Sequence, residues 1–156
     1  MSIVVDIVNS RITVAQFKDQ ELLNVLFLKE DEVLSSLEKL HFKNGIISNV
    51  GNKKLCQKIL RTFPDFVLMS HNLNFPVVLK YNSVLSLGHD RIANAVGAHA
   101  SFPNKNNLVI DVGTCITYDF LNNSNEYLGG GISPGFNLRM KALNSFTENL
   151  PVVNFK

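Results

Sequence analysis

The sequence predicts an α/β protein built on mixed β-sheets, and three observations lead to this prediction. Short runs rich in β-branched and aromatic residues alternate with stretches whose apolar residues recur at helical spacing. The strands nearest the N-terminus follow one another without an intervening helix, which favours hairpins over a purely parallel sheet. An aspartate-containing strand–turn–strand pattern occurs twice in the chain.

The first half of the chain predicts strands before helices. Residues 3–5 are β-branched and predict a buried strand that Asp6 ends, and Asn9-Ser10 is typical of a turn. Further strands are expected at residues 12–17 and 22–28. Helical spacing of apolar residues then predicts helices at 31–40 and 53–63, the second ended by Pro64. Short strands are expected at 45–48 and 66–69.

The second half begins with a predicted loop at 70–86, which contains a short extended piece at 77–79. A helix is expected at 90–100 and another at 134–146. Between them, strands are expected at 108–110, 115–121 and 127–128. The polar loop 103–107 is the best candidate boundary, and it divides the chain into a first lobe, 1–105, and the start of a second, 106–156.

Composition excludes several classes of protein. The chain has 156 residues and a net charge of +2, too balanced to indicate nucleic acid or an anionic membrane as partner. No apolar run is long enough to cross a bilayer, and the N-terminus lacks the basic segment of a signal peptide. Cys56 and Cys115 predict two reduced thiols, the second on a buried strand, and therefore a cytoplasmic protein.

The repeated pattern lies at residues 3–13 and 108–117. Each copy has an apolar strand, an aspartate (Asp6 or Asp111), a tight turn that holds Ser or Thr, and Ile-Thr at the start of a second strand. A carboxylate at a sheet edge beside backbone N–H groups and a hydroxyl suits a metal-bound phosphate. The alternative is that short β-turn-β segments look alike by chance.

The segment at residues 81–91 is the most informative stretch. Gly88 is followed by His89, Asp90 and Arg91 in the first turn of a predicted helix. Asp90 is explained by helix capping, but a cation in the first turn is unfavourable, so Arg91 is not. Free N–H groups together with Arg91 suit an anionic substrate group. Asp90 is then placed to accept a proton from a substrate hydroxyl.

These residues resemble the type III pantothenate kinase family. The resemblance rests on four segments in the same order and spacing: Asp6 with Asn9-Ser10, Tyr81 with residues 88–95, residues 109–114, and residues 127–135. It covers nearly the whole chain. It implies the fold of the acetate kinase, sugar kinase, Hsp70 and actin superfamily, in which two ribonuclease H-like lobes with mixed sheets are related by duplication.

The resemblance also implies a function: phosphorylation of pantothenate by ATP, supplied as the Mg-nucleotide, to give 4′-phosphopantothenate, the first step of coenzyme A synthesis. A homodimer and a monovalent cation, K⁺ or NH₄⁺, are implied as well, the cation held by Asp111. Asp90 would be the general base. Pantothenate would contact Tyr81, Gly88, His89, Asp90 and Arg91. ATP would contact Asp6, Ile7, Val8, Asn9, Ser10, Arg11, Ile12, Thr13 and Thr114.

Two departures from the family pattern leave alternatives open. The family's first loop reads Asp-x-Gly-Asn-Thr, and here Val8 and Ser10 replace Gly and Thr. A β-branched residue resists positive φ and restricts close backbone approach, so reduced nucleotide affinity is expected. The family pattern also continues beyond Lys156, with a further pantothenate-contacting Thr and the rest of the second lobe. The alternatives are a non-catalytic relative (a pseudokinase or a transcriptional accessory factor) and a superfamily member that acts on another hydroxyl substrate.

Overall fold

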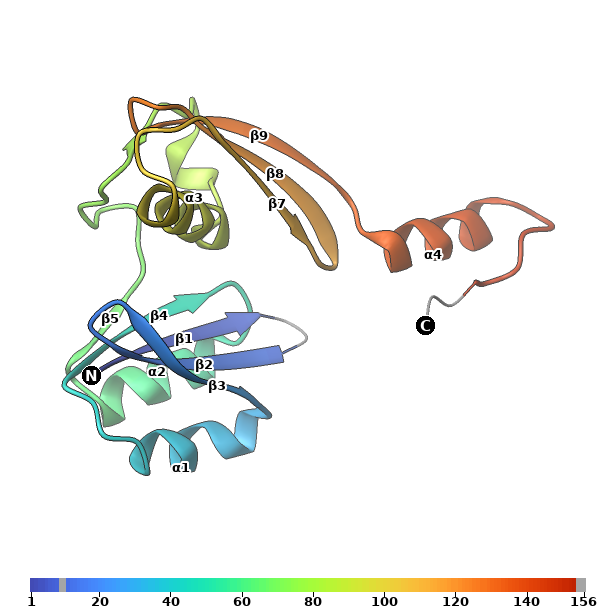
Figure 1. Ribbon diagram of the computed structural model, residues 1–156. Coiled ribbons are helices and arrows are strands. Elements are labelled where there is room, and N and C mark those ends of the chain that lie inside the picture. The colour runs from blue at the N-terminus through green and yellow to red at the C-terminus, as the bar shows by residue number, and fades with distance from the viewer. Residues whose placement is uncertain (9–10, 154–156) are drawn as a thin grey trace. The chain divides into compact units, whose positions relative to one another are not determined.

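The computed structural model describes residues 1–8 and 11–153 (Figure 1). They form two compact units, one comprising Met1–Leu73 and the other beginning at Asn74. Each unit contains one mixed β-sheet, which confirms the predicted α/β class. None of the helices in these residues has the length and apolar character needed to span a membrane.

The first unit is a five-stranded sheet with the order β3-β2-β1-β4-β5. The first three strands pair antiparallel, whereas β4 and β5 add in parallel on the other side of β1. Its elements are β1 (Ser2–Val8), β2 (Arg11–Lys18), β3 (Glu21–Leu28), a 3₁₀ turn (Glu30–Glu32), α1 (Val33–Glu38), β4 (Asn44–Asn49), α2 (Lys53–Thr62) and β5 (Phe66–Leu68).

The core of the first unit explains why this sheet forms. Alternate residues of β1 point to one face, and Ile3, Val5 and Ile7 are at most 1% exposed. They join a single apolar cluster with residues of both helices, among them Leu37 of α1 and Ile59 of α2. The cluster fixes the register of β1, because a slip by one residue would turn its apolar side chains to the opposite face.

The second unit is a four-stranded sheet with the order β6-β9-β8-β7. β7, β8 and β9 form an antiparallel meander, and α3 packs against β7 and β8 (Figure 1). Its elements are β6 (Val78–Leu79), a 3₁₀ turn (Val84–Ser86), α3 (His89–Ser101), β7 (Asn107–Val112), β8 (Cys115–Leu121), β9 (Glu126–Pro134) and α4 (Phe136–Phe146).

The internal repeat is confirmed as a repeat of structure. β1 and β2 form one antiparallel hairpin, and β7 and β8 form another. Asp6 lies opposite Thr13 in the first, and Asp111 lies opposite Thr117 in the second. The two aspartates therefore occupy the same kind of place, close to the turn end of the first strand of a hairpin.

Several expected boundaries are wrong. Asp6 does not end the first strand, since the ladder with β2 continues to Val8. The last strand runs from Glu126 to Pro134 rather than over two residues, because pairing with β8 outweighs the low strand propensity of three glycines. Cys115 is exposed, not buried, because it is the first residue of β8, beside the turn.

The division into units also differs from the expected boundary. The units separate between Leu73 and Asn74, whereas the polar loop 103–107 lies within the second unit. The packing of α3 against β7 and β8 joins the residues on the two sides of that loop. The assignment of 1–105 and 106–156 to two actin-like lobes stays a prediction.

Candidate functional site

A cavity of about 530 Å³ lies beside the β1–β2 hairpin in the first unit. Arg11 and Lys29 contribute two cations to its lining, against the single carboxylate of Glu30. Asn52, also in the lining, caps the N-terminus of α2 by accepting a 3.0 Å hydrogen bond from Leu55 N. Such a surface favours an anion. The lining consists of Ile7, Val8, Arg11, Ile12, Leu28, Lys29, Glu30, Gly51 and Asn52.

Val8 has a conformation that suits a β-branched residue. It is the last residue of β1, pairs with Arg11, and does not have positive φ. The expected conflict between Val8 and a positive φ is therefore wrong, whereas restricted access to the backbone stays a prediction. Asn9 and Ser10, the centre of the predicted ATP loop, lie outside the described residues.

The second candidate site begins at the first turn of α3. Gly88 is the N-cap of this helix, with φ −60° and ψ 138° and no side-chain cap. The Oδ1 atom of Asp90 accepts a 2.9 Å hydrogen bond from the backbone N–H of Arg91. A Cβ at Gly88 would collide with this same oxygen. Glycine at 88 thus leaves room for the Asp90 carboxylate to fold back over the start of the helix.

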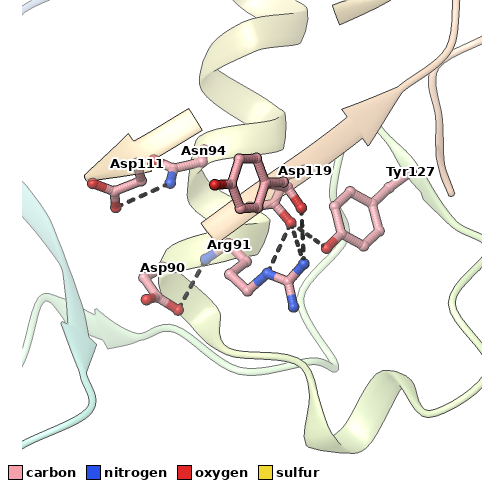
Figure 2. A network of polar contacts seen from close by, with 7 residues as sticks. Asp90, Arg91, Asn94, Asp111, Asp119 and Tyr127 are labelled. Atoms are coloured by element: carbon pink, nitrogen blue, oxygen red, sulfur yellow. Dashed lines mark hydrogen bonds and ion pairs between the residues drawn. The ribbon is translucent and has the colours of Figure 1, made fainter. Parts of the chain in front are cut away.

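Arg91 is buried and paired with Asp119 of β8 (Figure 2). Its Nε donates a 2.8 Å hydrogen bond to Asp119 Oδ1, and its Nη2 lies 2.7 Å from the same oxygen. Nη2 also donates to the carbonyl of Tyr118 at 3.2 Å. The hydroxyl of Tyr127 on β9 donates to Asp119 Oδ1 at 2.6 Å. Oδ1 of Asp119 therefore accepts hydrogen bonds from the side chains of Arg91 on α3 and Tyr127 on β9.

The pKa values of Arg91 and Tyr127 follow from this burial. Burial by itself lowers the pKa of Arg91, but the hydrogen bond and charge of Asp119 outweigh it and raise that pKa above its ordinary value. For the Tyr127 hydroxyl, burial and then the hydrogen bond to Asp119 raise the pKa far above its ordinary range. Arg91 thus stays charged and Tyr127 stays protonated at neutral pH.

Tyr81 reaches the same network from the loop before α3. Its ring meets that of Tyr127 edge-on, with 6.3 Å between centroids and 62° between planes. Gly129 faces Tyr81 from β9, where a Cβ would lie 3.0 Å from Tyr81 Cδ2. Gly129 also has a φ of 100°, which disfavours other residues. Gly129 therefore leaves the room that the Tyr81 ring occupies.

Asp111 lies at the exposed end of β7, near the turn into β8. Its Oδ2 accepts a 3.4 Å hydrogen bond from the Asn94 side chain on α3 (Figure 2). The N–H of Gly113 donates to the Cys115 carbonyl at 2.9 Å rather than to Asp111. The Gly113 N–H is therefore bonded within the turn and does not cap the Asp111 carboxylate.

Thr114 is exposed in the turn between β7 and β8. Its carbonyl accepts a 3.0 Å hydrogen bond from the N–H of Gly135, which follows β9. A Cβ at Gly135 would meet the carbonyl oxygens of Gly113 and Thr114. The glycine after Pro134 thus packs directly against the turn that holds Thr114, for which the family resemblance implies a contact with ATP.

Comparison with known proteins identifies the family. The family model described as type III pantothenate kinase matches residues 2–156. The chain belongs to this family. A type III pantothenate kinase of Bacteroides fragilis strain YCH46 is 38% identical over 160 residues, which cover 99% of this chain and 65% of that protein. The enzymes of Flavobacterium johnsoniae and Porphyromonas gingivalis are 36% and 39% identical, each covering 98% of this chain and 65% and 64% of their own length.

Membership of the type III pantothenate kinase family confirms the predicted resemblance and, with the two mixed sheets, the actin-like fold. The chain spans about 65% of the length of the curated relatives it matches.

The predicted site residues fall into one set in each unit. Asp6 to Thr13, apart from Asn9 and Ser10, lie on the β1–β2 hairpin of the first unit. The second unit brings Gly88, Asp90 and Arg91 together at the start of α3, with Tyr81 joined through Tyr127. His89 shares this first turn and is half-buried. Asp111 and Thr114 lie at the β7–β8 turn, with Asp111 tied to α3 by Asn94.

Sequence reasoning missed Asp119, the anion that holds Arg91. Its signal was a single carboxylate within an apolar strand, on the face it shares with Thr117 and Leu121. A charge at such a position requires a buried partner of opposite sign. Tyr127 was assigned no role, and Asn94 was noted only as part of the helix.

Proposed function

We propose that this protein transfers the γ-phosphoryl group of ATP to the hydroxyl of pantothenate and forms 4′-phosphopantothenate, the first step of coenzyme A synthesis. The observation that carries the proposal is the start of α3, where Gly88, Asp90 and Arg91 form a compact group in a chain of this family. The proposal extends to a cytoplasmic homodimer.

Asp90 is the proposed general base. Its carboxylate is half-buried at a helix N-terminus, where its Oδ1 already accepts one N–H. A carboxylate at this position can accept the hydroxyl proton as the phosphoryl group is transferred. Its neighbours Gly88, His89 and Arg91, with Tyr81, are the proposed contacts of pantothenate. Arg91 is the group suited to the pantothenate carboxylate.

ATP is proposed to bind at the two aspartate hairpins, with Mg²⁺ carried on its phosphates. In the first unit, the cations Arg11 and Lys29 in the cavity beside the hairpin suit a polyphosphate. In the second unit, Thr114 offers an exposed hydroxyl and N–H at the turn. Asp6 is the counterpart of Asp111 in this repeat.

Asp111 is the proposed ligand of K⁺ or NH₄⁺. Asp111 fits such an ion, since its carboxylate is exposed. Among the described residues its one side-chain partner is Asn94, through a long hydrogen bond of 3.4 Å. When bound, the cation would offset the repulsion between this carboxylate and a polyphosphate, about 4 kcal/mol for unit charges 4 Å apart at an effective dielectric of 20.

A coupled assay that follows ADP formation tests the proposed function. ATP turnover is expected to require pantothenate, and Asp90→Asn is expected to lower kcat by about 10²–10⁴-fold. Asp65→Asn, which changes an exposed aspartate of the first unit, is the matched control and is expected to leave kcat unchanged. An Asp90→Asn variant within about threefold of wild type on that scale would exclude Asp90 as the base.

The cation role of Asp111 is tested in the same assay by exchange of salts. Rates in K⁺ and NH₄⁺ are expected to exceed the rate in Na⁺, and Asp111→Asn is expected to abolish that difference. Equal wild-type rates in all three salts would show that Asp111 holds no activating ion.

A further inference from the structure

The carboxylate that holds Arg91 is outside the set of residues assigned to substrate binding. Asp119 is 1% exposed, and three contacts converge on its Oδ1: from Nε of Arg91 at 2.8 Å, from Nη2 at 2.7 Å and from the Tyr127 hydroxyl at 2.6 Å. Its Oδ2 is buried and has no hydrogen-bond partner among the described residues. Asp119 therefore contacts the Arg91 guanidinium only along its Nε–Nη2 edge.

This contact along one edge leaves Nη1 of Arg91 for a ligand. A guanidinium has five N–H groups, one on Nε and two on each terminal nitrogen. Nε and Nη2 are engaged by Asp119 and by the Tyr118 carbonyl. Nη1 makes no hydrogen bond to any described residue, and in Figure 2 the second terminal nitrogen of Arg91 points away from Asp119. An N–H group of Nη1 can donate a charge-assisted hydrogen bond to an oxygen of a carboxylate.

Tyr127 connects the two predicted substrate contacts, Arg91 and Tyr81. It is fully buried, and its hydroxyl donates to the oxygen that holds Arg91. Its ring meets the ring of Tyr81 edge-on, and Gly129 faces Tyr81 from β9. Through Asp119 and its own ring, Tyr127 therefore constrains both side chains from the sheet behind them.

We propose that Asp119 and Tyr127 are positioning residues, which hold Arg91 and Tyr81 in the binding geometry before the substrate arrives. A long arginine side chain otherwise loses rotamer freedom when it binds a ligand, and fixing it beforehand removes that cost. Asp119 also balances the guanidinium charge, so that Arg91 can be buried in the free protein. The inference rests on the proposed function in taking the carboxylate of pantothenate as the ligand of Nη1.

Kinetics separates positioning from a purely structural role. Asp119→Asn keeps the shape of the side chain and removes its charge. It is expected to raise KM for pantothenate by about tenfold or more, with kcat changed less than about threefold and KM for ATP unchanged. A residue that only supports the fold would lower stability and leave KM of the folded enzyme unchanged. Asp65→Asn is again the matched control.

A milder variant keeps the test decisive should Asp119→Asn fail to fold. Tyr127→Phe retains the ion pair of Arg91 and Asp119 and removes one hydrogen bond. It is expected to raise KM for pantothenate by about two- to tenfold, the range for loss of a single hydrogen bond. An unchanged KM in folded Tyr127→Phe, or in folded Asp119→Asn, would overturn the proposal.

A second measurement does not depend on catalysis. The chain has four arginines, so the Nε–H resonance of Arg91 can be assigned in a ¹⁵N–¹H spectrum by its loss in Arg91→Lys. Slow exchange of this proton with water is expected in the wild type, and fast exchange in Asp119→Asn. Fast exchange in the wild type would overturn the proposal. An inactive wild type with a slowly exchanging Arg91 would refute the proposed function and uphold the grip of Asp119 on Arg91.

Discussion

Replacement of Gly130 by alanine is expected to destabilise the second unit strongly. Gly130 lies on β9 opposite Asp119 of β8. A Cβ at this position would lie 2.6 Å from the carbonyl carbon of Tyr118 and 3.1 Å from Cα of Asp119, and would also collide with the Tyr118 carbonyl oxygen. All of these atoms belong to the backbone of the neighbouring strand, so no side chain can turn away to relieve the contact.

The size of the effect follows from this collision. Gly130 is itself exposed, but the added Cβ meets only backbone atoms, so the strand has to shift. Because overpacking costs about 1–3 kcal/mol, we expect a loss at the upper end of this range. The shift would also move the Tyr118 carbonyl, which accepts a 3.2 Å hydrogen bond from Arg91. Gly97→Ala is the matched control, since a Cβ at Gly97 has no atom within 4 Å apart from its chain neighbours and the backbone of its own helix. That change is in the interior of α3, where alanine is more stable than glycine by about 0.5–1 kcal/mol.

Tyrosine fluorescence measures the second unit by itself. The chain has three tyrosines and no tryptophan, and Tyr81, Tyr118 and Tyr127 all lie beyond Asn74. In urea unfolding followed by this signal, the midpoint is expected to fall for Gly130→Ala and to rise slightly for Gly97→Ala. A Gly130→Ala midpoint equal to that of the wild type would refute the argument from backbone contact.

Two further predictions concern the β1–β2 hairpin and the buried tyrosine. Val8→Gly is expected to tighten binding of a non-hydrolysable ATP analogue by opening the backbone beside the cavity, while lowering stability by about 0.5–1 kcal/mol; calorimetric titration that gave equal or weaker binding would contradict it. The pKa of Tyr127 is raised in the folded protein above its ordinary 10.0, so the stabilisation due to its protonated form is complete below about pH 10 and is lost as pH rises toward the folded value. Urea unfolding at about pH 8 and about pH 11 is therefore expected to show a larger loss of stability in the wild type than in Tyr127→Phe, and equal losses would contradict the raised pKa.

Local patterns predicted the hairpins and α3 because their causes are local. Alternating β-branched residues define β1 and β2, and the apolar face of α3 recurs every three or four residues. The strand predicted at 127–128 was too short, because three glycines have low strand propensity and local propensity does not reveal the pairing of β9 with β8. Only the ladder with β8 shows that Gly130 lies within a strand, opposite Asp119.

The candidate site was predicted only in part, because only some of its signals are local. Asp90 and Arg91 were found from their place at a helix start, which is a local signal. Asp119, the partner of Arg91, is 28 residues away in the sequence, and no local pattern indicates that its strand packs beside α3. A buried ion pair between distant segments follows from tertiary packing alone. Family resemblance supplied roles for Asp111 and Thr114, whereas the hydrogen bond of Asp111 with Asn94 needed the fold.

The two copies of the repeat differ in how their first strands are covered. Alignment of Asp6 with Asp111 makes three apolar positions of β1 equivalent to three of β7. In the first unit, α1 and α2 cover these side chains, which are at most 1% exposed. In the second unit, they lie on the face of the sheet away from Asp111, and more than half of each is exposed. The equivalent pairs are Ile3 (0%) with Leu108 (61%), Val5 (0%) with Ile110 (52%), and Ile7 (1%) with Val112 (57%).

This difference predicts that the second unit is the less stable of the two. Full burial of an aliphatic side chain stabilises a fold by about 1.5–3 kcal/mol, and the second unit lacks most of that contribution at three positions. The α4 helix does not compensate, since none of its residues is buried. Urea is therefore expected to unfold the second unit first. Tyrosine fluorescence, which reports that unit alone, should reach its midpoint at a lower urea concentration than far-UV circular dichroism, which reports both. Coincident transitions would show that the two units unfold together and that the exposed face of β7 does not limit stability.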